Sequence, residues 1–154
     1  MTPTLEAAGL RPHPMTMPGV DEPHPDGIGL AEWVAAAVER IDALPGEVVL
    51  VGHSGGGSVV WGAADARPDR VARVVFVDTV PTPPGFPIND FETEMLMGEY
   101  DREALERELE KWGPYADEYR AIEDVEVARI GSAHWPQFSW PQRLGELLVE
   151  AVKR

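Results

Sequence analysis

Apolar residues recur at helical spacing through residues 30–44, three or four positions apart, until the pair Pro45-Gly46 ends the pattern. The residues that follow this spacing are Leu30, Trp33, Val34, Val38, Ile41 and Leu44. Polar residues fill the positions between them, so the pattern predicts an amphipathic helix that lies on a sheet. A shorter helix is predicted before it, ending at Gly9.

Two runs of β-branched residues, 47–51 and 71–80, predict strands. Each run is short, apolar and bounded by turn residues, which is typical of parallel strands that are covered on both faces. Between the runs, the chain from about Ser54 to Arg67 is rich in alanine and stops at Pro68, so it predicts a helix. Strand, helix and strand in this order indicate a βαβ unit, with strand 47–51 in the centre of the sheet.

Weaker segments complete the expected sheet. Residues 6–19 hold a weak strand, and because Pro12 and Pro14 cannot donate ladder hydrogen bonds it is expected at a sheet edge. Residues 125–130 form a short strand that leads into a helix over 141–154. We therefore predict an α/β fold, a parallel sheet of about four strands in chain order. The helix from Leu30 and the helix after Ser54 should lie on opposite faces of this sheet or flank its central strands.

The segment 82–114 differs from the rest of the chain. It begins with turn residues that lack a clear period and continues into a narrow apolar stripe that Gly113-Pro114 ends. We interpret it as a cap-like insertion over one end of the sheet. The whole chain of 154 residues has the length of one domain, so we predict a single domain over 1–154.

Composition narrows the classes of partner. A net charge of −14 repels phosphate backbones and anionic lipid, so neither nucleic acid nor a membrane is expected as a partner. The chain has no cysteine, which excludes disulfides and thiolate chemistry. No apolar run approaches the roughly 18 residues that span a bilayer, and the first residues lack the pattern of a signal peptide. We expect a soluble, cytoplasmic protein with no cofactor and no metal.

The stretch Gly52-His53-Ser54-Gly55-Gly56 lies where strand 47–51 gives way to a helix. Gly-X-Ser-X-Gly at such a junction is the pattern of a nucleophile elbow, in which the serine takes a strained backbone conformation and its hydroxyl projects beyond the strand. The Gly55 N–H, at the positive end of the helix, is a candidate oxyanion donor. His53 is a candidate for the substrate side, as a turn residue beside the elbow. The alternative for Ser54 is a helix N-cap.

A serine nucleophile needs a base from another loop on the same edge of the sheet. His134 follows strand 125–130 by a few residues and is therefore predicted at that edge. His13 and His24 fall in the proline-rich entry region, where an exposed loop histidine is expected. The alternative for His134 is a structural role, packed on the aromatic rings that follow it at Trp135 and Phe138.

The third residue of such a site is a carboxylate that orients the imidazole. Asp78 closes strand 71–80 at the edge where Ser54 projects, whereas Asp124 precedes strand 125–130 and lies at the opposite end. This placement favours Asp78. Asp90 is an alternative from a loop, and Asp78 has an alternative role as the cap of the turn after its strand.

Three stretches, LEAAGLRPHPMTMPG, VVLVGHSGGGSVVWGAADARPDRVARVVFVD and SAHWPQFSWPQRLGELL, together resemble the α/β-hydrolase superfamily. They are most similar to bacterial esterase-like members with a Gly-His-Ser-Gly-Gly elbow, and the resemblance covers most of the chain outside 82–114. It implies Ser54 as nucleophile, His134 as base and Asp78 as acid. It also implies small carboxylic esters or thioesters as substrates, because serine at the elbow disfavours the dehalogenases and epoxide hydrolases of the superfamily.

The chain departs from this family in ways that bear on activity. In the family, a His-Gly loop with the second oxyanion N–H precedes the segment that LEAAG resembles, and a further strand precedes the last one; neither is found in this sequence. We therefore expect a reduced hydrolase with half of its oxyanion hole and weak activity. The alternatives are a catalytically silent remnant that binds a ligand or a protein, and a homo-oligomer formed through exposed sheet edges.

Overall fold

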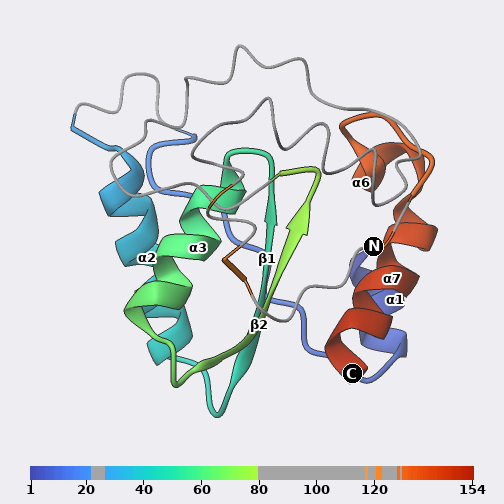
Figure 1. Cartoon of the computed structure of the whole chain (residues 1–154), viewed down its shortest axis with the longest axis horizontal. Helices are drawn as coiled ribbons and strands as arrows, with labels where there is room; N and C mark the ends of the chain where they lie inside the picture. The colour runs from blue at the N-terminus through green and yellow to red at the C-terminus, as the bar shows by residue number, and fades with distance from the viewer. Residues whose placement is uncertain (22–26, 80–116, 118–120, 123–127, 129) are drawn as a thin grey trace. The chain divides into compact units, whose positions relative to one another are not determined.

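The computed structural model describes residues 1–21, 27–79, 117, 121–122, 128 and 130–154 (Figure 1). The chain divides into two compact units, one of His13–Thr82 and one of Met1–Pro12 with Pro83–Arg154. The predicted insertion, 82–114, lies outside the described residues, and the single domain stays a prediction. Each unit is described by itself below.

A parallel pair of strands forms the centre of the first unit. Strand β1 (Val48–His53) pairs with strand β2 (Val71–Val77), and the register runs from Val49 opposite Arg73 to His53 opposite Val77. The chain between them forms helix α3 (Gly56–Ala66), so the predicted βαβ unit is present. The α/β class with a parallel sheet flanked by helices is thereby confirmed, with two strands in the described part of the chain.

Helix α2 (Leu30–Asp42) packs against α3, and the two helices share one core. The buried residues of this core are Ala37, Ile41, Val59 and Ala63, and Val48, Leu50 and Val71 of the strands pack against it. A Cβ at Gly62 would come within 2.9 Å of Val34 Cγ2, which shows how closely the helices approach. The helices therefore lie on the same side of the sheet (Figure 1). Of the two arrangements that the sequence left open, opposite faces is wrong, and helices that flank the strands is the one that agrees with the shared core.

The other face of β1 is less covered than the sequence pattern predicts. Val51 is 44% exposed, although the run of β-branched residues indicated a strand buried on both faces. Side chains alternate along a strand, so Leu50 enters the core below α3 while Val51 points to the opposite side.

The edge strand expected within residues 6–19 does not form. Instead the end of this segment contacts α2 and its core: Met17 packs against the core, and the Trp33 indole N–H donates a 2.9 Å hydrogen bond to the carbonyl of Pro18. Pro12 and Pro14 remove two ladder donors, and contacts with α2 replace strand pairing. The fourth expected strand, 125–130, falls for the most part outside the described residues.

Two arginines join the end of α2 to the start of β2. The Arg70 guanidinium donates hydrogen bonds to the carbonyls of Ile41, Leu44 and Gly46 at 3.1, 2.5 and 2.9 Å, which ties the turn after α2 to the residue before β2. Arg67 donates to both carboxylate oxygens of Asp42, each at 2.8 Å. These contacts hold the crossover in place at the end of the sheet remote from Ser54.

The second unit contains helices α1 (Thr2–Ala7), α6 (Pro136–Ser139) and α7 (Pro141–Lys153). Helix α7 is amphipathic as predicted and buries Leu144, Gly145 and Leu148. A Cβ at Gly145 would come within 2.9 Å of Thr4 Cβ, so α1 and α7 pack closely. The chain leaves α1 through Gly9 at φ 82°, a conformation that glycine adopts without strain.

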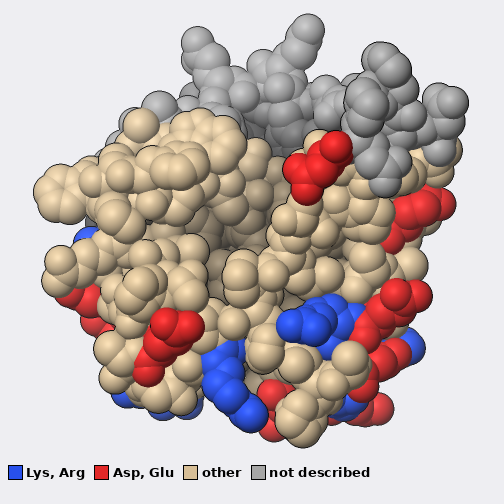
Figure 2. Space-filling model, turned by 180° about the vertical axis from the view of Figure 1, so that it is seen from behind, with Lys and Arg blue, Asp and Glu red and all other residues tan. Residues whose placement is uncertain are grey.

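Charged side chains of both signs lie next to one another on the surface shown in Figure 2. Arg143, for example, lies 3.3 Å from Glu146 and 3.8 Å from Glu150 on α7. Pairs as exposed as these contribute little stability. In the described part of the chain, no helix is both long enough and apolar enough to cross a bilayer.

Candidate active site

Ser54 occupies the turn between β1 and α3 in a left-handed backbone conformation, with φ 53°. Gly55 is the N-cap of α3, and the Gly57 N–H donates a 2.9 Å hydrogen bond to the carbonyl of Ser54. A left-handed conformation is costly for a residue with a side chain. The tight turn therefore holds Ser54 in a strained backbone between the carboxyl end of a strand and the amino end of a helix.

Gly52 is the position at which this turn tolerates no side chain. A Cβ there would lie 2.5 Å from the carbonyl oxygen of Gly56 and 2.6 Å from Val60 Cγ2. The carboxyl end of β1 and the first turn of α3 are thus in direct backbone contact. Gly56, by contrast, has open space where its Cβ would be. Of the two outer glycines of the Gly-X-Ser-X-Gly pattern, the close approach requires only the first.

The amino end of α3 offers a backbone donor beside Ser54. The Gly55 N–H makes no hydrogen bond to any residue in the described ranges, and Gly55 provides no capping side chain. Peptide dipoles give this end of a helix partial positive charge, so a developing anion is favoured there. His53, which precedes Ser54 in the chain and is the last residue of β1, is half-buried.

Asp78 follows β2 as Ser54 follows β1, and it has the same unusual backbone, with φ 49°. Because His53 and Val77 are register partners, the residues that follow them leave the sheet side by side. Among the described residues, these two are the non-glycine positions with positive φ. The sequence thus placed Asp78 at the correct edge of the sheet.

Thr79, the next residue, was not singled out by the sequence. Its Oγ1 and Cγ2 lie 2.6 and 2.7 Å from where a Cβ of Gly57 would be, so it packs on the first turn of α3. The position after β2 thereby supports the turn that carries Ser54. The signal in the sequence that could have pointed to such a contact was Gly57 in the first turn of the helix, because a residue without a side chain permits a close neighbour.

His134 belongs to the second unit, in the turn that precedes α6. Its half-buried ring meets the ring of Trp135 edge to face, with 5.0 Å between centroids. This contact agrees with one half of the structural alternative, packing on Trp135 and Phe138; the Phe138 ring lies against Trp135, with 5.9 Å between centroids. Pairing of His134 with Ser54 stays a prediction, because the two residues lie in different units.

Two serines on either side of His134 contact each other across the turn, and they were not singled out from the sequence. The Oγ atoms of Ser132 and Ser139 are 2.5 Å apart. The Ser132 Oγ also lies 2.9 Å from the carbonyl oxygen of Ala133, and the Ser139 Oγ lies 3.2 Å from that of Trp135. Each hydroxyl has one proton, so one serine donates to the other, which in turn donates to the carbonyl beside it. We call Ser132 and Ser139 the serine clamp. Its only signal in the sequence is a pair of hydroxyl residues on either side of the histidine.

The remaining candidates lie elsewhere. His13 lies against Arg40, with 3.1 Å between its Nδ1 and a guanidinium nitrogen. His24, Asp90 and Asp124 fall outside the described residues. No group of three or more metal-ligating side chains gathers in the described part of the chain.

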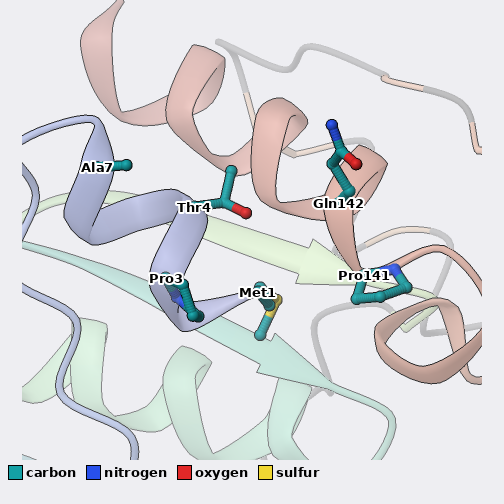
Figure 3. A pocket seen from close by; sticks show the side chains of 6 residues that line it. All are labelled: Met1, Pro3, Thr4, Ala7, Pro141 and Gln142. Atoms are coloured by element: carbon teal, nitrogen blue, oxygen red, sulfur yellow. The ribbon is translucent and has the colours of Figure 1, made fainter.

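An open pocket lies between α1 and the start of α7 (Figure 3). Its lining consists of Met1, Pro3, Thr4, Ala7, Pro141 and Gln142, which include no acidic, basic or histidine side chain. None of the candidate catalytic residues, Ser54, Asp78 and His134, lines it.

Comparison with known proteins identifies the class. Residues 3–151 match the model of the alpha/beta hydrolase family, and the chain belongs to this family. It is 32% identical over 106 residues to a pyrethroid hydrolase of Sphingobium wenxiniae, a match that covers 66% of this chain and 36% of that protein. It is 34% identical over 112 residues to the lipase LipV of Mycobacterium tuberculosis, covering 66% of this chain and 43% of the relative. The matches thus span less than half the length of these relatives. No solved structure matches the chain significantly.

Proposed function

We propose that the protein hydrolyses small carboxylic esters or thioesters with Ser54 as nucleophile. The observation that carries the proposal is the left-handed backbone of Ser54 on a turn that places Gly52 against the backbone of Gly56. A non-glycine residue strained in this way, between a parallel strand and a helix N-terminus, is the geometry that exposes a serine hydroxyl for attack. The names of the two relatives, a hydrolase and a lipase, support the same reaction class.

The proposed reaction proceeds in two steps. The Ser54 Oγ attacks the carbonyl carbon while His134 accepts the hydroxyl proton, and the Gly55 N–H donates to the oxygen that becomes negative. Collapse of this intermediate breaks the bond to the alcohol or thiol, which takes the proton from His134 and leaves an acyl-serine. Water then attacks the acyl-serine while His134 accepts its proton; the bond between the acyl carbon and Ser54 Oγ breaks, Oγ takes the proton back from His134, and the carboxylic acid departs.

Asp78 is the proposed acid that orients the imidazole of His134. Its position beside Ser54 at the carboxyl edge of the sheet supports this role. Gly55 supplies one oxyanion donor, and loss of one donor from such a pair costs on the order of 10² to 10³ in rate. No second donor is assigned among the described residues, so activated esters such as 4-nitrophenyl acetate are the substrates we expect to be turned over detectably.

Covalent labelling tests the proposal. The wild-type chain should react with a fluorophosphonate and gain one phosphonyl group at Ser54, while the Ser54→Ala variant and heat-denatured wild type should not. Hydrolysis of 4-nitrophenyl acetate should fall to background in Ser54→Ala, in His134→Ala and equally in the double variant, because nucleophile and base act as a unit. Activity that persists in Ser54→Ala would overturn the proposal. Folded protein without labelling or hydrolysis would favour a silent binding module.

A further inference from the structure

The turn that carries His134 is flanked by exposed aromatic rings. Trp135, Phe138 and Trp140 are 52, 78 and 55% exposed. Large apolar side chains clustered at the surface mark binding sites more often than chance. Here they occur within a few residues of the proposed base, at the start of α6 and α7.

This part of the chain also lacks formal charge. The run from Ile130 to Gln142 contains no Asp, Glu, Lys or Arg, although such residues make up 26% of the protein. The protein carries a net charge of −14, so thirteen consecutive residues without a charged side chain, 130–142, are a local exception in the sequence. A molecule that binds there meets apolar rings and no charged side chain of this run.

The rings form a continuous contact from the histidine outward. The centroids of His134 and Trp135 are 5.0 Å apart, and those of Trp135 and Phe138 are 5.9 Å apart. Pro136, between them in the chain, is fully buried and begins α6. Anchoring at Pro136 and at the serine clamp keeps these rings at the surface. We call Trp135 and Phe138 the aromatic patch.

We propose that the aromatic patch binds the apolar part of an uncharged ester, with preference for an aryl or alkyl group next to the scissile bond. The inference rests on the proposed function, because it takes His134 as the base. The ring of Trp135 contacts His134, so in this proposal one of the two substituents of an ester held at the imidazole lies against Trp135. Aromatic faces bind aryl groups by offset or edge contacts. Residues 130–142 offer no Lys or Arg to pair with a carboxylate, and the net charge of −14 repels anions, so carboxylated substituents are disfavoured.

The kinetic test compares 4-nitrophenyl phenylacetate with 4-nitrophenyl acetate. Wild type should prefer the phenylacetate, and Phe138→Ala should lower the ratio of the two kcat/KM values by about tenfold, the scale of one lost apolar contact in a pocket. Phe138 is the first choice because its exposure makes a folding defect improbable. Trp135→Ala should lower the ratio further. Val20→Ala, which removes apolar surface at a 58% exposed residue of the first unit, should leave it unchanged. An unchanged ratio in both patch variants would overturn the proposal.

A second kinetic experiment distinguishes binding of single dissolved substrate molecules from attachment of the protein to an aggregated lipid surface. The patch variants should lose activity toward 4-nitrophenyl phenylacetate that is dissolved below its solubility limit. A loss confined to emulsified tributyrin would assign the patch to attachment at a lipid surface and would contradict the proposal.

Direct binding separates this inference from the proposed catalysis. Saturation-transfer NMR on the Ser54→Ala protein should show transfer to the phenyl protons of ethyl phenylacetate, and addition of Phe138→Ala should remove it. Transfer that depends on Phe138 would support the patch even if fluorophosphonate labelling fails. Absence of transfer in a protein that hydrolyses esters through Ser54 would reject the patch and leave the catalytic proposal intact.

Discussion

Ser54 and Asp78 are matched residues of neighbouring strands: each is the first residue after its strand, and each has a left-handed backbone, at φ 53° and 49°. Their preceding residues, His53 and Val77, pair in the parallel register. Two strained non-glycine residues therefore lie side by side at the carboxyl edge of the sheet. Strain of this kind persists only where surrounding structure enforces it, and this edge is where open α/β sheets bind ligands.

The strain at Ser54 predicts that glycine is more stable than alanine at this position. Alanine retains the steric cost of a Cβ at φ 53°, whereas glycine does not, so Ser54→Gly should exceed Ser54→Ala by about 1 kcal/mol in the free energy of unfolding. Urea denaturation of the two variants measures the difference. The control is Ala35→Gly, at an exposed position inside α2, which should destabilise by about 1 kcal/mol. Equal stability of the two Ser54 variants would show that the left-handed turn is not maintained.

The two outer glycines of the motif should respond to alanine with opposite signs. At Gly52 the new Cβ would meet Gly56 O at 2.5 Å, and both groups belong to tightly placed backbone, so Gly52→Ala should destabilise by about 2 to 3 kcal/mol. At Gly56 the space is open and the residue is helical, so alanine should stabilise by up to about 1 kcal/mol. Thermal and urea unfolding measure both. The prediction fails if Gly52→Ala is as stable as Gly56→Ala.

The serine clamp should hold His134 in place for catalysis. Removal of either hydroxyl, in Ser132→Ala or Ser139→Ala, loses a surface hydrogen bond of about 1 kcal/mol, equivalent to about a fivefold loss in kcat if the bond positions the base. KM should change little. Each substitution breaks the shared Oγ–Oγ contact, so the loss in the double variant should be smaller than the product of the two single losses. Losses that multiply in the double variant, or a change in KM alone, would contradict a positioning role. The pH profile of kcat/KM for 4-nitrophenyl acetate is the second readout.

The ion pair of Asp42 and Arg67 should make part of the stability depend on pH. Hydrogen bonds from Arg67 lower the pKa of Asp42 below its ordinary 3.8. Because the folded pKa lies below the unfolded one, the stabilisation is present above this ordinary value and is lost as the pH falls through the folded pKa. Asp42→Asn should therefore be less stable than wild type at neutral pH, and the gap in urea midpoint should narrow in acid. In an Arg67→Gln background the same substitution should have a smaller effect, because the charge of Arg70 is then the remaining cause that lowers the pKa of Asp42. An undiminished gap in that background would refute the pairing.

The sequence by itself determined the local elements of the first unit. β-branched runs predicted β1 and β2, the helical spacing from Leu30 predicted α2, and the glycines around Ser54 predicted a tight strand-to-helix turn. These features depend on side-chain period and on the backbone freedom of single residues, which neighbours in the chain specify. The placement of Asp78 at the carboxyl edge of the sheet, where Ser54 also lies, followed from the direction of parallel strands alone.

Tertiary structure decided what depends on contacts between distant residues. The pairing of α2 with α3 on one side of the sheet required the approach of Val34 to Gly62, which no periodicity expresses. The end of the proline-rich segment before α2 lies against the core without forming a β-strand. The carbonyl of Pro18 accepts its hydrogen bond from the Trp33 indole N–H and not from a neighbouring strand. The serine clamp likewise arose from the turn into α6, which brings Ser132 to Ser139. Such contacts form only when the chain folds back on itself, so a pattern read along the sequence cannot contain them.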